Sequence, residues 1–202
     1  MHDGCAVILA AGMAARMGSA KQLLPLKGSC MLEHVIKLAL VEDFTHVIVV
    51  IGHEAERIVQ SIQIDDPRFL WHINPLYELG QSTSFKAGIA KALEFHSSVM
   101  VFLGDQPFIQ SQTVHSLWSF AKRKMQELQE PFVIQPIYQE KPGHPVFFGN
   151  ICKEQFARLE GDQGAKPIIA DMQPRMFLPV DDPGIHLDID TREDFEQAEH
   201  IS

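Results

Sequence analysis

Short apolar runs alternate with amphipathic segments over the first two thirds of the chain, and this alternation is the feature that most constrains the fold. Expected strands span residues 5–10, 46–51, 69–72, 99–103 and 132–138, and expected helices span residues 31–41, 54–61, 84–95 and 113–125. The strand segments are continuously apolar, which is typical of parallel strands covered by helices on both faces. The sequence therefore predicts an α/β fold with a mostly parallel sheet.

The pattern changes after residue 138. The segment Lys141-Pro-Gly-His-Pro145 interrupts the series, and it precedes expected strands at 146–148 and 175–179 and expected helices near 151–159, 165–172 and 192–200. A segment of this length is too short to bury a core of its own. We therefore expect residues 1–202 to form a single domain, in which residues from about 139 to 202 form a flap and a closing layer on the same sheet.

The charge of the chain disfavours nucleic acid as a partner. There are 17 Lys and Arg against 26 Asp and Glu, which gives a formal net charge of −9 with the ten histidines neutral. Proteins that bind a phosphate backbone gather many cations on one surface, whereas the only tight basic cluster here is at 122–124. A small phosphorylated ligand is compatible with this charge because it needs only one or two well-placed cations.

Apolar stretches and cysteines indicate a cytoplasmic protein without a membrane segment. The longest apolar stretches, at 5–11 and 47–51, are far below the roughly 18 residues of a membrane helix. The start of the chain lacks the basic region of a signal peptide. The three cysteines form no Cys-x-x-Cys pair, as expected of reduced thiols.

A glycine-bearing loop follows the first expected strand, with the sequence Leu9-Ala-Ala-Gly-Met-Ala-Ala-Arg-Met-Gly-Ser-Ala-Lys21. Small residues let backbone N–H groups approach a ligand, and Arg16 and Lys21 bring two cations to the loop. The alternative is a glycine-rich turn with solvated cations. The segment matches neither a Walker A loop nor a dinucleotide fingerprint. We favour phosphate binding.

Acidic residues at two distant places are candidate metal ligands. Asp105, preceded by Gly104, closes an apolar strand, where open α/β sheets bind ligands. Asp188 and Asp190 alternate about one residue, so both carboxylates would lie on one face of an extended segment. Together these side chains could form a Mg²⁺ site with nucleotide phosphates. The alternative is that they only cap a turn and a helix.

Several further polar residues are candidates for ligand contacts. Gln81 and Ser82 precede an expected helix and could bond a base or a ribose, although residues 82–84 also suit a plain helix N-cap. His144 stands in a glycine-bearing loop and could line a pocket. Lys166 follows a glycine-rich turn and could hold a second anion, or it is an exposed lysine at a helix start.

The motifs taken together resemble the molybdenum-cofactor cytidylyltransferase-like branch of the MobA-like NTP transferases. The resemblance runs in order from residue 5 to residue 195 and rests on the loop at 9–21 and on the segments Gly80-Gln-Ser, Gly104-Asp-Gln-Pro, Gly143-His-Pro-Val146, Gly161-Asp-Gln-Gly-Ala165 and Asp188-Ile-Asp-Thr191. It implies a three-layer α/β/α Rossmann-like nucleotidyltransferase fold.

The resemblance also implies roles for individual residues. Nucleotide contacts are expected from Leu9, Ala10, Ala11, Gly12, Gln81, Ser82 and Gly104, and triphosphate contacts from Arg16 and Lys21. Catalysis is expected from Arg16, Lys21 and Asp105. Asp105 and Asp190 are expected to bind Mg²⁺, with Asp188 as a further candidate ligand. His144 and Lys166 are expected on the acceptor side. Ala11, where the guanylyl branch has a second glycine, resembles the cytidylyl branch. Lys166 departs from the arginine more usual in the family and leaves the acceptor open.

The implied activity is transfer of a nucleotidyl group, CMP from CTP, to a phosphorylated acceptor with release of pyrophosphate. Molybdopterin or its molybdenum-bound form is the expected acceptor, and a molybdoenzyme or its maturation chaperone is an expected partner. Two alternatives stay open at this point. One is an NTP transferase that acts on a sugar or polyol phosphate, and the other is a non-catalytic nucleotide-binding partner in molybdoenzyme maturation.

Overall fold

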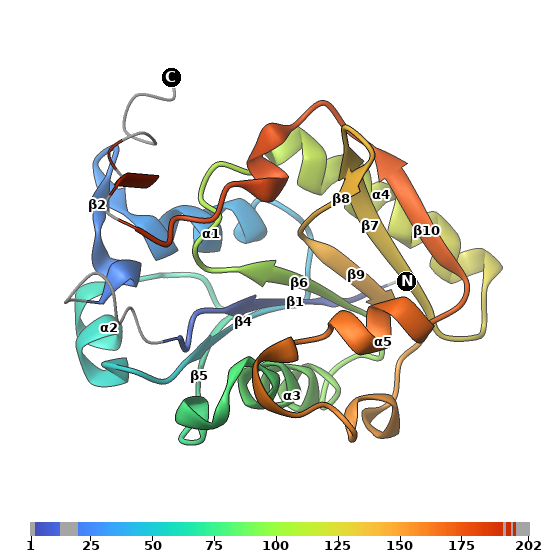
Figure 1. The fold of residues 1–202 in the computed structure, drawn as a ribbon, viewed down its shortest axis with the longest axis horizontal. Helices are drawn as coiled ribbons and strands as arrows, with labels where there is room; N and C mark the ends of the chain where they lie inside the picture. The colour runs from blue at the N-terminus through green and yellow to red at the C-terminus, as the bar shows by residue number, and fades with distance from the viewer. Residues whose placement is uncertain (1–2, 13–19, 192, 195, 197–202) are drawn as a thin grey trace.

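The structure is a computed structural model that describes residues 3–12, 20–191, 193, 194 and 196. A central sheet runs through the molecule, with helices packed against it (Figure 1). Its strands are β1 (Cys5–Leu9), β4 (His46–Ile51), β5 (Phe69–Ile73), β6 (Val99–Leu103), β7 (Phe132–Tyr138), β8 (Lys141–Pro142), β9 (Val146–Gly149) and β10 (Arg175–Pro179). A separate two-stranded hairpin joins β2 (Pro25–Leu26) and β3 (Ser29–Cys30).

The strand order in the sheet is β10-β7-β9-β6-β1-β4-β5, and β8 pairs with β7. Strands β6, β1, β4 and β5 are parallel neighbours, as are β7 and β10. Strand β9 runs antiparallel between β6 and β7. The predicted mostly parallel sheet is therefore confirmed.

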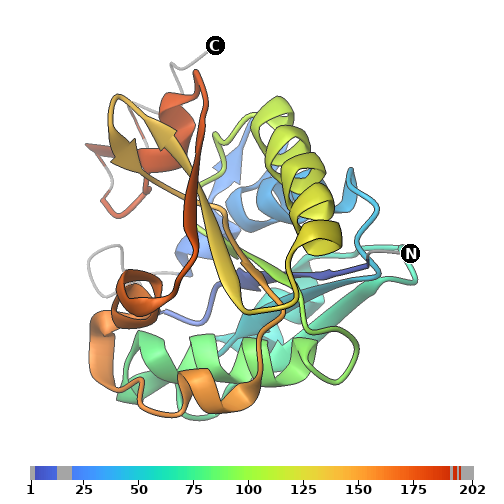
Figure 2. The same cartoon turned by 90° about the vertical axis from the view of Figure 1, so that its right-hand side faces the viewer.

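Helices cover both faces of this sheet (Figure 2). Helices α1 (Met31–Leu40), α2 (Ala55–Ser61) and α4 (Ser111–Glu127) pack on one face, and α3 (Gln81–Ala92) and α5 (Lys166–Asp171) pack on the other. Strand β1 sends Ala6 and Ile8 into the first layer and Cys5 and Val7 into the second. Both faces of the strand are thus buried, which explains its continuous apolar run.

Short 3₁₀ turns connect several of these elements: Lys21–Leu23, Tyr77–Leu79, Lys153–Phe156, Gly161–Gln163 and Pro183–His186. The predicted helix near 151–159 is wrong, because only the turn at Lys153–Phe156 forms there. Ile151, Phe156 and Leu159 are all buried, and the first two are five positions apart, which does not match a helical face. The predicted helix at 192–200 falls mostly outside the described residues.

The C-terminal third contributes to the same sheet as the N-terminal part. Strand β9 fills the place between β6 and β7, and β10 adds an edge strand next to β7. Strands β7 and β8 form a hairpin whose two turn residues, Gln139 and Glu140, both have positive φ. The single-domain prediction stays a prediction, and this shared sheet supports it. Among the described residues, no helix has the length and the apolar character needed to cross a membrane.

Candidate functional site

The candidate site lies at the carboxyl ends of β1 and β6, which are parallel neighbours in register from Cys5 with Val99 to Leu9 with Leu103. The two chain segments that leave these strands therefore start side by side. The N–H of Gly104 donates to the carbonyl of Leu9 over 2.9 Å. A Cβ at position 104 would lie 2.8 Å from the Cβ of Ala10, so this close approach requires glycine. Ligands bind at this edge in open α/β sheets.

Lys21 lies between two carboxylates from distant parts of the chain. Its Nζ donates to Asp105 Oδ2 over 2.7 Å and to Asp190 Oδ1 over 2.8 Å. The Lys21 side chain is only 14% exposed. Burial alone would lower the pKa of Lys21, but the charges and hydrogen bonds of Asp105 and Asp190 outweigh burial and hold that pKa above its usual value. The ammonium group is thus firmly charged.

This cluster has the chemistry of a cation site. The described residues contain no group of three His, Cys, Asp or Glu side chains arranged to hold a metal ion. Asp105 and Asp190 nevertheless converge on one cationic group, the Lys21 ammonium. Carboxylate oxygens are the hard ligands that Mg²⁺ and Mn²⁺ take, with phosphate and water oxygens completing the shell. The carboxylates of Asp105 and Asp190 therefore fit a divalent cation whose remaining ligands come from outside the described residues.

Asp188 points to a different partner from Asp190. Its Oδ1 accepts a hydrogen bond of 2.7 Å from Nε2 of Gln106, while the residue between the two aspartates, Ile189, is buried. Burial raises the pKa of Asp188; the Gln106 hydrogen bond opposes this rise, and the charges of Asp105 and Asp190 add to it. The two aspartates lie in the same region, but the structure directs only Asp190 to Lys21.

The start of the loop after β1, at residues 10–12, is held by Gln22, which the sequence motifs did not single out. Gln22 is 3% exposed, and its Nε2 donates to the carbonyls of Ala10 (2.8 Å) and Gly12 (3.2 Å). Ala11 is buried, whereas Gly12 is exposed. The signal in the sequence was a polar residue directly after Lys21, which by itself does not show burial. Arg16, expected on the triphosphate, lies outside the described residues.

The first turn of α3 borders the same edge of the sheet. The helix begins at Gln81, three positions before the predicted start, so Gln81 and Ser82 belong to the helix itself. The N–H of Gln81 donates to Asp162 Oδ1 over 3.2 Å. Ser82 is buried, and its hydroxyl donates to the carbonyl of Glu160 over 3.1 Å. In this structure these bonds tie α3 to the segment at 160–164, and Gln81 is exposed.

His144 stands near Asp105 and Lys166, both of which act on its charge. Burial lowers the pKa of the His144 imidazole to about 4; the negative Asp105 opposes this shift and the positive Lys166 adds to it. His144 is therefore neutral at pH 7. The backbone N–H of His144 donates to the carbonyl of Ile185 over 3.3 Å, and Lys166 begins α5 with an exposed side chain.

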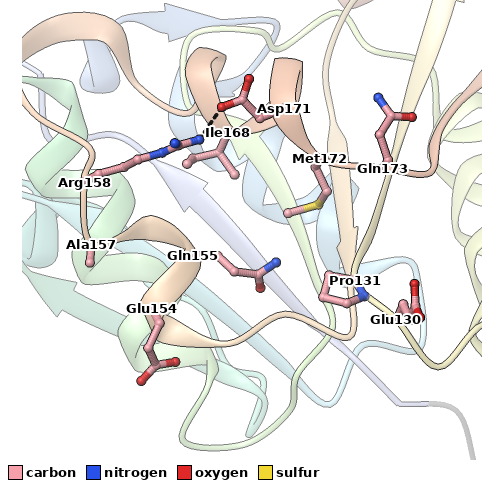
Figure 3. Close-up of a pocket in the computed structure, with 10 residues that line it drawn as sticks. All are labelled: Glu130, Pro131, Glu154, Gln155, Ala157, Arg158, Ile168, Asp171, Met172 and Gln173. Carbon is pink, nitrogen blue, oxygen red and sulfur yellow. Dashed lines mark hydrogen bonds and ion pairs between the residues drawn. The ribbon is translucent and has the colours of Figure 1, made fainter.

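An open groove of about 570 Å³ lies elsewhere, between the turn before β7 and α5 (Figure 3). Its lining includes Glu130, Glu154, Arg158, Asp171 and Met172, and Arg158 forms an ion pair with Asp171 across it. None of the predicted site residues lines this groove. Lys21, Asp105 and Asp190 instead meet at the carboxyl ends of β1 and β6.

Comparison with known proteins identifies the family that this chain resembles over most of its length. The family model of the MobA-like NTP transferase domain matches residues 6–176. The molybdenum cofactor cytidylyltransferase of Escherichia coli (strain K12) is 27% identical over 94% of this chain and 92% of its own length. The purine catabolism protein PucB of Bacillus subtilis (strain 168) is 28% identical over 95% of this chain and 94% of its own.

Solved structures share the fold. The Rv0371c protein of Mycobacterium tuberculosis H37Rv superposes with a TM-score of 0.79 at 24% identity, covering 96% of this chain and 97% of that one. The same protein in complex with manganese gives a TM-score of 0.75 at 23% identity, with 98% of each chain covered. The predicted three-layer fold is thereby confirmed.

Proposed function

The chain belongs to the MobA-like NTP transferase family, and we propose that this nucleotidyltransferase moves CMP from CTP to the phosphate of molybdopterin or of the molybdenum cofactor. The observation that carries the proposal is the meeting of Lys21 with Asp105 and Asp190 beside the loop at 10–12. The similarity to the cytidylyltransferase of Escherichia coli, over nearly the whole of both chains, supports the choice of CTP and of the acceptor.

The reaction needs positioning and charge neutralisation more than a reactive side chain. An oxygen of the acceptor phosphate attacks the α-phosphorus of CTP, a new P–O bond forms, and the bond from the α-phosphorus to the bridging oxygen breaks. Pyrophosphate leaves with the electron pair. Negative charge grows on the leaving group, and the proposed role of Lys21 and Arg16 is to stabilise it. No covalent enzyme intermediate is required.

A divalent cation, Mg²⁺ in our proposal, would be held by Asp105 and Asp190. Such a cation neutralises the phosphates and orients the α-phosphoryl group when it is bound. The Rv0371c protein of similar fold has been solved with manganese, which supports a divalent cation here. The Lys21 ammonium now bonded to both carboxylates would then be free to turn toward the β- and γ-phosphates.

The remaining residues are assigned by their place around this cluster. We propose that the nucleotide lies against the first loop and the start of α3, with contacts from Leu9, Ala10, Ala11, Gly12, Gln81, Ser82 and Gly104. We assign His144 and Lys166 to the acceptor, and the effect of both Asp105 and Lys166 on the charge of His144 supports this assignment. The neutral imidazole offers a hydrogen bond without a charge, and Lys166 offers a cation for the acceptor phosphate.

Two features of the cellular setting belong to the same proposal. A molybdoenzyme or its maturation chaperone would receive the product, because a cofactor that has gained a nucleotide must pass to the enzyme that uses it. We also propose a cytoplasmic location, since Cys5, Cys30 and Cys152 are free thiols, as is usual in a reducing compartment.

One experiment tests the function and its alternatives. Pyrophosphate release is measured with each of the four common NTPs against a panel of acceptors: molybdopterin, the molybdenum cofactor, sugar phosphates and polyol phosphates. Release that requires CTP and a molybdopterin acceptor supports the proposal. Release with a sugar or polyol phosphate alone would replace the acceptor. Nucleotide binding without release from any pair would indicate a non-catalytic partner.

A further inference from the structure

Gln106 is a buried polar residue inside the candidate site, and neither the motifs nor the proposed chemistry assigns it a role. It follows Asp105 directly, yet it is only 2% exposed. Its Nε2 donates to Asp188 Oδ1 over 2.7 Å and to the carbonyl of Ile185 over 3.3 Å. Burying an amide is costly unless its hydrogen bonds replace those of water. The burial of the Gln106 amide at this position therefore needs an explanation.

The orientation of this amide is fixed by its two partners. A backbone carbonyl and a carboxylate only accept hydrogen bonds, so Nε2 and not Oε1 must face them. Oε1 is buried and has no hydrogen-bond partner among the described residues. In the Gln106 amide, Nε2 therefore has hydrogen-bond partners and Oε1 has none among the described residues. A donor at this point matters more to the structure than a fully satisfied side chain.

The bonds of Gln106 join two segments that are far apart in the chain. The N–H of Ile189 also donates to the carbonyl of Asp105 over 2.9 Å, so residues 105–106 contact residues 185–189 at three points. Asp190 follows immediately and bonds Lys21. Fixing Asp188 and Ile189 therefore fixes the place of Asp190 relative to Asp105.

We propose that Gln106 is a positioning residue, which holds the segment at 185–190 against Asp105 and thereby brings Asp190 to the cation site. Asp188 then acts as an anchor, which means that it accepts the hydrogen bond from Gln106 and does not bind the cation. Only Asp105 and Asp190 contact the cation. The inference rests on the proposed function, because that function assigns the two aspartates to a divalent cation. Outer partners of this kind commonly tune metal affinity by orienting the ligands.

The test compares Mn²⁺ binding in two matched variants, with free Mn²⁺ measured by its EPR signal. Gln106→Met keeps the length of the side chain and removes the donor, and we expect about tenfold weaker Mn²⁺ binding. Gln135→Met is the control, because Gln135 is also a buried amide and its Oε1 accepts bonds from Arg175, but it lies on β7, with β9 between it and β6. We expect this control to bind Mn²⁺ like the parent.

A second pair of variants separates an anchor from a ligand and does not depend on whether Gln106→Met folds. Asn at position 188 retains an oxygen that accepts from Gln106, whereas Ala does not. We therefore expect Asp188→Asn to bind Mn²⁺ much more like the parent than Asp188→Ala does. Equal losses in both variants would show that Asp188 is itself a ligand and would overturn the inference.

The remaining outcomes are also decisive. Parental Mn²⁺ binding in Gln106→Met would overturn the positioning role and leave the proposed function intact. A parent protein that binds no Mn²⁺ would overturn the cation assignment, and the inference with it. Thermal unfolding of each variant shows whether a loss of binding is a loss of fold.

Discussion

Lys21 Nζ lies 2.7 Å from Asp105 Oδ2, although 84 positions separate the two residues in the chain. The bond joins the end of the first loop to the end of β6, and Asp190 contacts the same ammonium. A cationic group thus already occupies the point where the two carboxylates converge. The contributions of Lys21, Asp105 and Asp190 can therefore be tested one at a time by substitution.

Asp105→Asn should cut turnover by roughly two orders of magnitude, equivalent to about 3 kcal/mol in the barrier, because it removes a charged ligand of the proposed cation. Pyrophosphate release with CTP measures it. Asp171→Asn is the control, since Asp171 pairs with Arg158 in the separate groove of Figure 3. Near-parental turnover of Asp105→Asn would remove Asp105 from the cation site. Asp190→Ala should resemble Asp105→Asn.

Lys21→Met should lower turnover or weaken CTP binding, because it removes a cation that faces the leaving pyrophosphate. It also leaves Asp105 and Asp190 without their shared ammonium. The variant should therefore gain more thermal stability from Mn²⁺ than the parent does, since the cation relieves that repulsion. The control is Lys122→Met: Lys122 lies on α4 and pairs with Asp43, and this variant should gain no more than the parent. Equal gains in Lys21→Met and parent would contradict the shared-site geometry. Arg16→Ala should likewise impair turnover.

His144 should make the protein less stable as the pH falls from about 6.5 to about 4. Burial lowers its pKa from 6.5 to about 4 on folding, so the unfolded chain takes up a proton first. The stability given by the neutral imidazole is fully present above the unfolded pKa and is lost through this window. The loss is at most about 3 kcal/mol. Urea unfolding at several pH values measures it, and His144→Gln should show a shallower pH dependence. Identical profiles in the parent and in His144→Gln would show that His144 does not cause this pH dependence.

Ala11→Gly tests base choice. The parent should prefer CTP over GTP by about 10–200-fold if the methyl of Ala11 narrows the base pocket, and the variant should relax that preference. Ala11 is 2% exposed and belongs to the apolar cluster on the α3 face, so the change should also lower stability. Ala39→Gly, at a buried position in α1, controls for lost stability. Equal use of CTP and GTP by the parent would defeat the cytidylyl assignment alone.

The sequence by itself determined the layers of this protein. Parallel strands buried on both faces leave continuous apolar runs, and the segments at 46–51 and 99–103 form strands with the expected bounds. The segments at 132–138 and 175–179 also form strands with the expected bounds, the second at the edge of the sheet. Lys21, Asp105 and the pair of Asp188 and Asp190 could also be selected from the sequence, because small residues and charges next to apolar segments have a local signature. Periodicity and turn chemistry act over a few neighbouring residues, so a sequence shows them directly.

Only the tertiary structure decided which of these residues meet. Lys21 and Asp190 are 169 positions apart, and no local pattern distinguishes Asp190, which reaches Lys21, from Asp188, which turns to Gln106. The insertion of β9 between β6 and β7 likewise depends on pairing between distant strands. Glutamine is usually found on the protein surface. Gln22 and Gln106 are buried because backbone carbonyls and a carboxylate from other segments accept their hydrogen bonds. Such bonds exist only after the chain has packed.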